Sequence, residues 1–485
     1  MFTQRRAHRT LGGIALTALV AASAPTLTAS ADQPSAYPSS AYPSPSHPSP
    51  PYPSTEVNSV QQWNDTAGQV AVASCISPNG NPLHESRMYA MTFLAVHDAL
   101  NTVDRRYQPY APGKKKTTTK GASADAAVAG AARTVLVSAV EELPVPPECR
   151  AAALEVAQDA YTTALEAVPD GPAEDAGVAT GVAAAERIIA RRAGDGSDTP
   201  LVVKDFEQGT EPGQWRFTPD RPFAFAPGWA DVKPFALKGK AGFRAAPPYP
   251  LRSKAYARDF AEVKALGGDG VGTPSARTAD QTEAARFWIE SSPLQWNRIA
   301  RSVAVQRELD PWESARLFAL LNTALADGYI ASWAVKYDDL FWRPVTAIPE
   351  AGNDGNRATK PDPTWTPLDT TPPIPDHDSA HAVQGAAAAT VMTRFFGTDR
   401  VSFSTCSLTL PEGQQCDDPN PTERTYRRFS QAAQENADSR VWVGYHFRHA
   451  SEVGLGHGRR VAILATSGLL KKARGGSHHG CPKAS

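Results

Sequence analysis

The stretch PDHDSAHAVQGAAAA, residues 375–389, places two histidines, two aspartates and one serine directly before an alanine-rich run. Three prolines between residues 372 and 375 disfavour a helix upstream. Either Asp378 or Ser379 can act as the N-cap of a helix that follows. Gly397 is then the expected C-terminal stop. The stretch therefore predicts a buried helix that begins directly after a dense polar cluster.

The polar cluster admits three interpretations. Ser379, Ala380 and His381 fall in the first helical turn, where free backbone N–H groups and the helix dipole attract anions. The second interpretation is a capped helix whose histidine has no functional role, because the same sequence pattern would result. A zinc site is the third alternative, since His377 and His381 are four residues apart. His377 precedes the expected cap, however, and no glutamate follows it as in HExxH.

Helical patterns also dominate the chain outside this stretch. From residue 57 onward, segments rich in Ala, Leu and Glu carry apolar residues near the 3.6-residue period. These segments are 85–104, 124–143, 149–168, 176–194, 277–309, 311–344 and about 422–472. Residues 200–255, rich in Pro, Phe and Trp, form a long irregular excursion, and strand-like runs are few and short. The expectation is an all-α fold of helical bundles with long irregular loops, as a single domain over residues 57–473.

The two ends of the chain have different compositions. Residues 1–31 combine three arginines, a short apolar run and the small-residue site Ala29-Ser30-Ala31, which is the layout of a secretory signal peptide. Arg5-Arg6 leaves both the general secretory and the twin-arginine routes open. Residues 32–56 form a Pro/Ser-rich low-complexity tether, and residues 474–485 a flexible tail. The mature protein is expected to be secreted.

The net charge limits which classes of partner the protein can bind, and the cysteine content indicates possible disulfides. Removing residues 1–31 takes away three arginines and no acids, so the formal charge changes from −1 to −4. Such a chain offers no electrostatic basis for binding nucleic acid, and no apolar run is long enough to span a membrane. Five cysteines can form disulfides in an exported protein. Cys406 and Cys416 flank a loop-like stretch and are the expected pair.

A second candidate site lies in SWAVKYDDLFWRP, residues 332–344. Helical spacing places Trp333, Lys336 and Arg343 on one face, with the helix ending at Pro344. Two cations and a tryptophan on one face suit an anion site. An amphipathic helix whose long side chains reach solvent is the alternative.

A third candidate site lies in SRVWVGYHFRHASEVG, residues 439–454. Arg440 and His446 are expected on one helix, with Gly444 allowing close packing beside His446. His449, one turn further, is expected to face solvent or to support the site. Taken alone, each of these residues has an ordinary structural explanation.

Taken in order, the three segments spell K-x6-RP, S-x-H and S-R-x5-H. This combination resembles the signature of the vanadium-dependent haloperoxidase and type 2 phosphatidic acid phosphatase superfamily, in its bacterial haloperoxidase-like branch. The similarity covers most of residues 60–465 and implies an all-helical fold built on four-helix bundles.

The resemblance implies a vanadate cofactor and names the residues that would bind it. The equatorial oxygens of vanadate would be neutralised by three cations, Lys336, Arg343 and Arg440. Ser379 would hydrogen-bond the oxyanion, and Ala380, where the family usually has glycine, would offer its backbone N–H. His446 would coordinate vanadium at the apical position.

The same resemblance implies an oxidation reaction on small molecules. His381 would be the acid–base group that takes a proton from hydrogen peroxide, and Lys336 would polarise the bound peroxide. Trp333 resembles a halide-site tryptophan. Halide would then be oxidised to hypohalous acid, which reacts with an organic acceptor. A histidine at a helix N-terminus has a lowered pKa, which suits a group that accepts a proton near neutral pH.

Two departures from the family pattern bear on the activity. Ala450 stands four residues after His446, where many members have the aspartate that orients a phosphatase histidine. Its absence disfavours the alternative of a secreted acid phosphatase with His446 as nucleophile. Ile374 replaces an aromatic residue near the halide, so the halide preference stays open. A non-catalytic oxyanion-binding protein is the third alternative, although two histidines exceed what anion capture needs.

Overall fold

The computed structural model describes residues 57–113, 119–238 and 243–473. Thirteen α-helices and four strands of two or three residues make up the described part, which confirms the all-α expectation. The predicted signal peptide, tether and tail lie outside the described residues. No helix in the described ranges is both long enough and apolar enough to cross a membrane.

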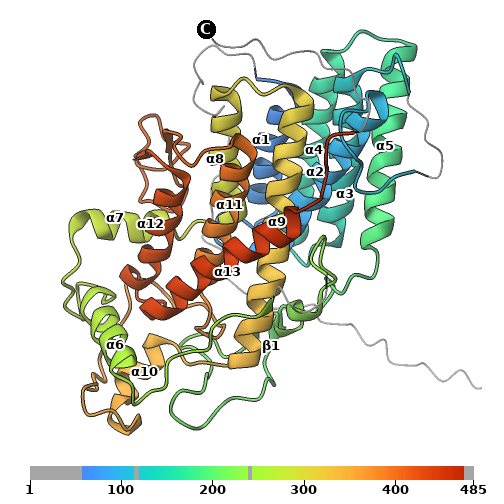
Figure 1. Ribbon diagram of the computed structural model, residues 1–485. Helices are drawn as coiled ribbons and strands as arrows, with labels where there is room; N and C mark the ends of the chain where they lie inside the picture. The colour runs from blue at the N-terminus through green and yellow to red at the C-terminus, as the bar shows by residue number, and fades with distance from the viewer. Residues whose placement is uncertain (1–56, 114–118, 239–242, 474–485) are drawn as a thin grey trace, which may run out of the picture. The chain divides into compact units, whose positions relative to one another are not determined.

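Five helices form the N-terminal group, drawn in blue to green in Figure 1. In this group α3 packs against α5, α2 packs against both, and α4 packs against α1 and α3. Small residues allow the close approach, since a Cβ added at Gly181 would lie 2.2 Å from the Ala127 carbonyl oxygen. The helices are α1 (Ser59–Ala73), α2 (Pro82–Val103), α3 (Ala124–Glu142), α4 (Pro147–Glu166) and α5 (Pro172–Arg192).

The long helix α9 (Pro311–Asp339) joins this group to the second one. It contacts α2 on one side and α11 and α13 on the other (Figure 1). Its start follows from the sequence: Asp310 accepts a hydrogen bond from the Glu313 N–H in a capping box, and Pro311 occupies the first helical position. The remaining helices of the second group are α8 (Ser292–Gln306), α11 (Ala380–Phe396), α12 (Phe429–Trp442) and α13 (Arg448–Thr466).

Short elements and loops complete the described chain. The expected irregular excursion is confirmed: before α6 begins, its described residues contain the short elements β1 (Val202–Val203), β2 (Ala224–Phe225) and the 3-10 helix η1 (Pro227–Asp231). Two antiparallel pairs occur, β1 with β2 and β3 with β4. The other short elements are α6 (Lys254–Leu266), α7 (Ala279–Phe287), α10 (Pro344–Glu350), η3 (Ala351–Asn353), β3 (Phe403–Thr405) and β4 (Arg424–Tyr426).

Within the described residues, two disulfides close loops of different length. The Cys406–Cys416 bridge confirms the sequence prediction. The bridge from Cys75 to Cys149 was not foreseen, because the two residues are 74 positions apart and lie at the end of α1 and the start of α4. It joins two helices that also pack against each other.

The structure corrects two predicted helix boundaries. Arg343 does not share a helix with Lys336: α9 ends at Asp339, and Arg343 is the N-cap of α10. Leu340 adopts the left-handed conformation where α9 ends. Pro344 then occupies the first position of α10 and disfavours helical geometry at Arg343. His446 likewise lies beyond the end of α12, in the loop before α13. In addition, the segment 277–309 contains two helices, α7 and α8, rather than one.

Candidate active site

Lys336 enters the site from the last turn of α9. Its ammonium group is fully buried and donates to two backbone carbonyls, that of Pro375 at 2.9 Å and that of Asp376 at 3.1 Å. Burial, and after it the neighbouring charge of Arg343, lowers the pKa of Lys336 to about 7. The predicted cation thus lies directly beside the loop that precedes α11.

Arg343 reaches the same loop from the start of α10. Its Nε donates to the Ile374 carbonyl at 2.8 Å, and its Nη1 donates to the Tyr445 carbonyl at 2.9 Å. The same Nη1 lies 3.0 Å from Nε2 of His446. One guanidinium therefore joins the segment before α11 to the loop that carries His446. Burial lowers the pKa of Arg343 to about 10.

Asp376 is a site residue that the sequence analysis missed. Its Oδ1 lies 2.9 Å from Nδ1 of His446, and both side chains are buried. A neutral His446 that donates from Nδ1 keeps a lone pair on Nε2, the nitrogen that faces Arg343. The aspartate that is missing at Ala450 is therefore supplied from another segment. Nothing in the sequence connects positions 70 residues apart, so only the fold reveals this pair.

Ser379 and His381 lie where the sequence placed them, at the start of α11. Ser379 is the N-cap, but its hydroxyl makes no hydrogen bond to the helix, unlike an ordinary serine cap. Ala380 is the first residue of α11, so its N–H belongs to the turn that has no partner within the helix. Burial lowers the pKa of His381 well below its ordinary value, and Arg440 adds to the effect. His381 is therefore a neutral base near pH 7.

Arg440 comes from the last turn of α12. Its Nη1 donates to the Trp288 carbonyl at 2.8 Å, and its guanidinium carbon lies 4.9 Å from the centre of the Tyr445 ring. The five principal side chains act on one another: Arg343, Lys336, Arg440 and His381 all contribute to holding the pKa of His446 low, after burial itself. The predicted residues of the three sequence segments thus converge on one place.

Asp378 does not cap α11, contrary to one of the two expectations. Its carboxylate instead accepts from the Ser332 hydroxyl at 2.7 Å and lies 2.6 Å from Nδ1 of His457. All three side chains are fully buried. They bind the segment before α11 to α9 and α13, and so fix the position of Ser379.

His377 and His449 lie apart from these groups. Nε2 of His377 is 2.7 Å from the Ala246 carbonyl, and burial lowers its pKa to about 4. His449 stacks on Tyr249 with ring centres 3.6 Å apart. The two histidines pack against each other, 5.5 Å between ring centres. His377 therefore points to a different partner from His381, which opposes the zinc interpretation.

Trp333 is buried in an apolar cluster next to α11. It packs edge-on against Phe225 and Tyr329, and Ile374 and Ala380 belong to the same cluster. The loop from the irregular excursion thus supplies an aromatic residue, Phe225, on the side where Ile374 departs from the family pattern. Its contribution could not be assigned from the sequence.

The site fits an oxyanion because several buried donors lack partners. Among the described residues, Ser379 Oγ, His381 Nε2 and Arg440 Nε are buried without any hydrogen-bond partner. A buried polar atom without a partner is costly, and a bound water, ion or ligand can satisfy it. Together with Lys336, Arg343, His446 and the Ala380 N–H, they form what we call the oxyanion cradle. A multiply charged tetrahedral or trigonal-bipyramidal anion matches this set of donors.

The cradle lies within a segment that known proteins share. Residues 316–475 match the family model described as the second helical-bundle domain of vanadium chloroperoxidase. This segment is therefore similar to that domain of vanadium chloroperoxidase. The match contains every residue of the cradle. A curated relative, vanadium chloroperoxidase of Curvularia inaequalis, is 28% identical over 237 residues, and the alignment spans 38% of this chain and 38% of the length of that protein.

Solved structures extend the similarity to the N-terminal helices. The first bacterial vanadium-dependent iodoperoxidase superposes with a TM-score of 0.68 at 23% identity, over 88% of this chain and all of the other. A holo-type bacterial vanadium-dependent chloroperoxidase gives a TM-score of 0.64 at 17% identity, over 86% of this chain and 98% of the other. The chain therefore has the vanadium haloperoxidase fold over most of its length.

Proposed function

We propose that the protein is a vanadate-dependent haloperoxidase that oxidises halide with hydrogen peroxide to hypohalous acid. The observation that carries the proposal is the set of buried donors without partners, Ser379 Oγ, His381 Nε2 and Arg440 Nε, beside two buried cations. Fixed donors in a buried site stabilise charge without reorganisation during reaction. Similarity to haloperoxidases within the matched segment supports the same activity.

Each residue of the cradle has a defined role in this proposal. Lys336, Arg343 and Arg440 would hold the oxygens of vanadate, with Ser379 Oγ and the Ala380 N–H completing the hydrogen bonds. His446 would coordinate vanadium through Nε2, because Asp376 accepts the proton on Nδ1. Bound vanadate supplies a Lewis-acid centre that activates peroxide toward halide.

His381 is proposed as the group that accepts the proton of hydrogen peroxide. Its lowered pKa keeps the ring neutral, and its Nε2 is buried without a partner. Trp333 and Phe225 form the wall proposed to lie beside the halide. The partners of the reaction are therefore small molecules: peroxide, halide and an organic acceptor.

Purified full-length protein tests the proposal. With vanadate, hydrogen peroxide and bromide, it should brominate a phenolic dye, and omission of vanadate should abolish the reaction. His381→Ala should abolish turnover while vanadate still binds. An enzyme that hydrolyses a phosphate ester steadily but never halogenates would overturn the proposal.

A phosphatase is the second candidate, because the structure restores the carboxylate that the sequence lacked. Asp376 meets Nδ1 of His446 as an orienting aspartate would in a phosphohistidine mechanism. In this reaction Nε2 of His446 attacks phosphorus, the alcohol leaves, and water then hydrolyses the phosphohistidine. Trapping labelled phosphate on His446 during turnover would favour it, and its absence with active halogenation would exclude it.

We further propose that the protein is exported. The support is the composition of residues 1–31, with the arginines, the apolar run and Ala29-Ser30-Ala31 in the order of a signal peptide. Mass spectrometry of protein from the culture medium should then find an N-terminus at residue 32. Retention of residues 1–31 in the mature protein would contradict export by this route.

A further inference from the structure

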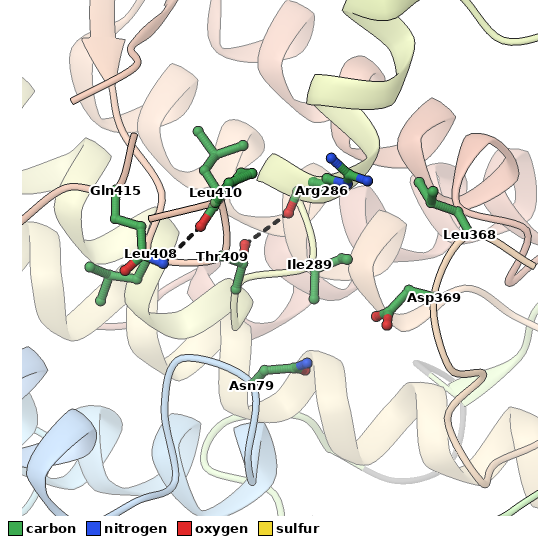
Figure 2. A pocket seen from close by; sticks show the side chains of 10 residues that line it. Asn79, Arg286, Ile289, Leu368, Asp369, Leu408, Thr409, Leu410 and Gln415 are labelled. Atoms are coloured by element: carbon green, nitrogen blue, oxygen red, sulfur yellow. Dashed lines mark hydrogen bonds between the residues drawn. The ribbon is translucent and has the colours of Figure 1, made fainter. Parts of the chain in front are cut away.

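A pocket with a volume of about 340 Å³ is lined by the side chains shown in Figure 2, and some of these residues contact residues in or next to the cradle. One wall is the Cys406–Cys416 disulfide loop, through residues 408–411 and Gln415. The opposite wall comes from Ile289 and the segment Leu368–Asp369, while Arg286 and Asn79 lie at its edges. No residue of the cradle itself lines this pocket.

Residues in two walls of the pocket contact residues in or next to the cradle. The carbonyl groups of Ile289 and Glu290 lie against the His381 ring, where they act to raise its pKa against the stronger effect of burial. On the other side, Asp369 accepts a hydrogen bond from the Tyr445 hydroxyl at 2.5 Å. The Tyr445 carbonyl in turn accepts from Arg343. A molecule in the pocket is thus separated from the cradle by single residues.

The lining has the chemistry of a small-molecule site. Half of the lining residues carry apolar side chains, which suit a flat apolar body: Ile289, Leu368, Leu408, Leu410 and Pro411. The other half is polar, and its one carboxylate, Asp369, is hydrogen-bonded by the Tyr445 hydroxyl. The guanidinium of Arg286, at the end of α7, has no hydrogen-bond or ion-pair partner among the described residues. Its charge is available for a carboxylate, with which arginine forms paired hydrogen bonds. The volume falls within the range of pockets that enclose small ligands.

We propose that this pocket binds a small aromatic carboxylate, held by Arg286, as the organic acceptor of the reaction. The proposal rests on the haloperoxidase activity proposed above. The hypohalous acid that the proposed activity forms would be the halogen source for the bound ring. In the reaction a carbon–halogen bond forms, the oxygen–halogen and carbon–hydrogen bonds break, and the released proton and hydroxide form water. The disulfide loop therefore gives the halogenation a preferred substrate.

Direct binding tests the pocket without vanadate or peroxide. Calorimetry on the full chain should detect 4-hydroxybenzoate, with neutral phenol bound at least about tenfold more weakly. Arg286→Gln should raise the Kd of 4-hydroxybenzoate about tenfold, because one charge-assisted contact is worth about that factor. Leu408→Trp should also weaken binding by filling the space. Arg394→Gln, an exposed arginine at the far end of α11, is the matched control and should leave the Kd unchanged.

Product analysis then separates the pocket from the activity. Oxidation of iodide by the wild-type chain without organic acceptor reports the proposed function alone. With 4-hydroxybenzoate and phenol in competition, the wild type should halogenate the carboxylate preferentially, and Arg286→Gln should show the preference of free hypohalous acid. Failure of iodide oxidation alone would refute the haloperoxidase. Iodide oxidation with no binding of 4-hydroxybenzoate, or with the same Kd in Arg286→Gln, would refute the pocket.

Discussion

One residue, Asp376, makes three contacts at the cradle. Its N–H donates to the Phe341 carbonyl at 2.9 Å, its own carbonyl accepts from Lys336, and its carboxylate meets His446. Burial raises the pKa of Asp376 to about 7, against the opposing charges of Arg343 and Lys336. A buried acid among buried cations is retained here because it orients a histidine and offsets positive charge.

Replacing Asp376 with asparagine tests this role. The Asp376→Asn variant keeps the shape of the side chain but loses the charge and the specific acceptor for the His446 Nδ1 proton. We expect vanadate affinity to fall about ten- to a hundredfold, the usual cost of removing a group that orients a metal ligand. Quenching of tryptophan fluorescence by vanadate measures it. Asp338→Asn, at an exposed position of α9, is the control, and equal affinities in both variants would contradict the role.

At the scale of elements, the geometry of the cradle depends on how closely α13 packs against α11. A Cβ added at Gly458 would lie 2.0 Å from the Val383 carbonyl oxygen, and one at Gly454 would lie 2.7 Å from the Ser379 carbonyl oxygen. Real Cβ atoms do not approach so closely, so any larger residue must push the two helices apart. The glycines therefore set the position of the first turn of α11.

Two glycine substitutions on the same helix should have opposite effects. Gly458→Ala should destabilise the protein by about 1–3 kcal/mol, the cost of overpacking a fixed interface. Gly456→Ala meets nothing within 4 Å and should stabilise it by about 0.5–1 kcal/mol, because alanine loses less backbone entropy in a helix. Urea unfolding of both variants measures the difference. Equal stabilities would mean that the α11–α13 interface can relax.

Local signals explain which elements the sequence could predict. The start of α11 at Ala380 follows from upstream prolines and a capping serine, all within a few residues. The sequence shows that a helix is interrupted at Pro344, but it does not show on which side of the proline the helix lies. Proline occurs both just after the end of one helix and at the first position of the next. The helix predicted to carry both Arg440 and His446 is interrupted at Gly444, whose φ of 84° lies in the left-handed region, between the end of α12 and the start of α13. The Asp376–His446 contact depends on tertiary packing across 70 residues, so no local pattern could reveal it.

At the scale of the whole molecule, ionisable groups buried away from the cradle link stability to pH. Glu85, in the first turn of α2, is fully buried and accepts a hydrogen bond from Ser291. Burial raises its pKa from 4.5 to about 8, which outweighs the hydrogen bonds and the charge of Arg298. The folded state therefore holds this proton more tightly than the unfolded state, which makes Glu85 a neutral acid at pH 7.

The sign of the resulting pH dependence is fixed by that shift. A group whose pKa is raised on folding contributes its full stability below the unfolded value of 4.5 and loses it as the pH rises toward about 8. Glu85→Gln keeps the shape and cannot ionise, so it should remove this loss, which is on the order of a few kcal/mol. Urea unfolding at pH 5 and pH 8.5 should show that the free energy of unfolding of the variant, relative to that of the wild type, is higher at pH 8.5 than at pH 5. Glu141→Gln, at an exposed position of α3, is the control and should follow the wild type at both values. A wild type and a Glu85→Gln variant that lose stability in parallel would mean that Glu85 is ionised in the folded protein.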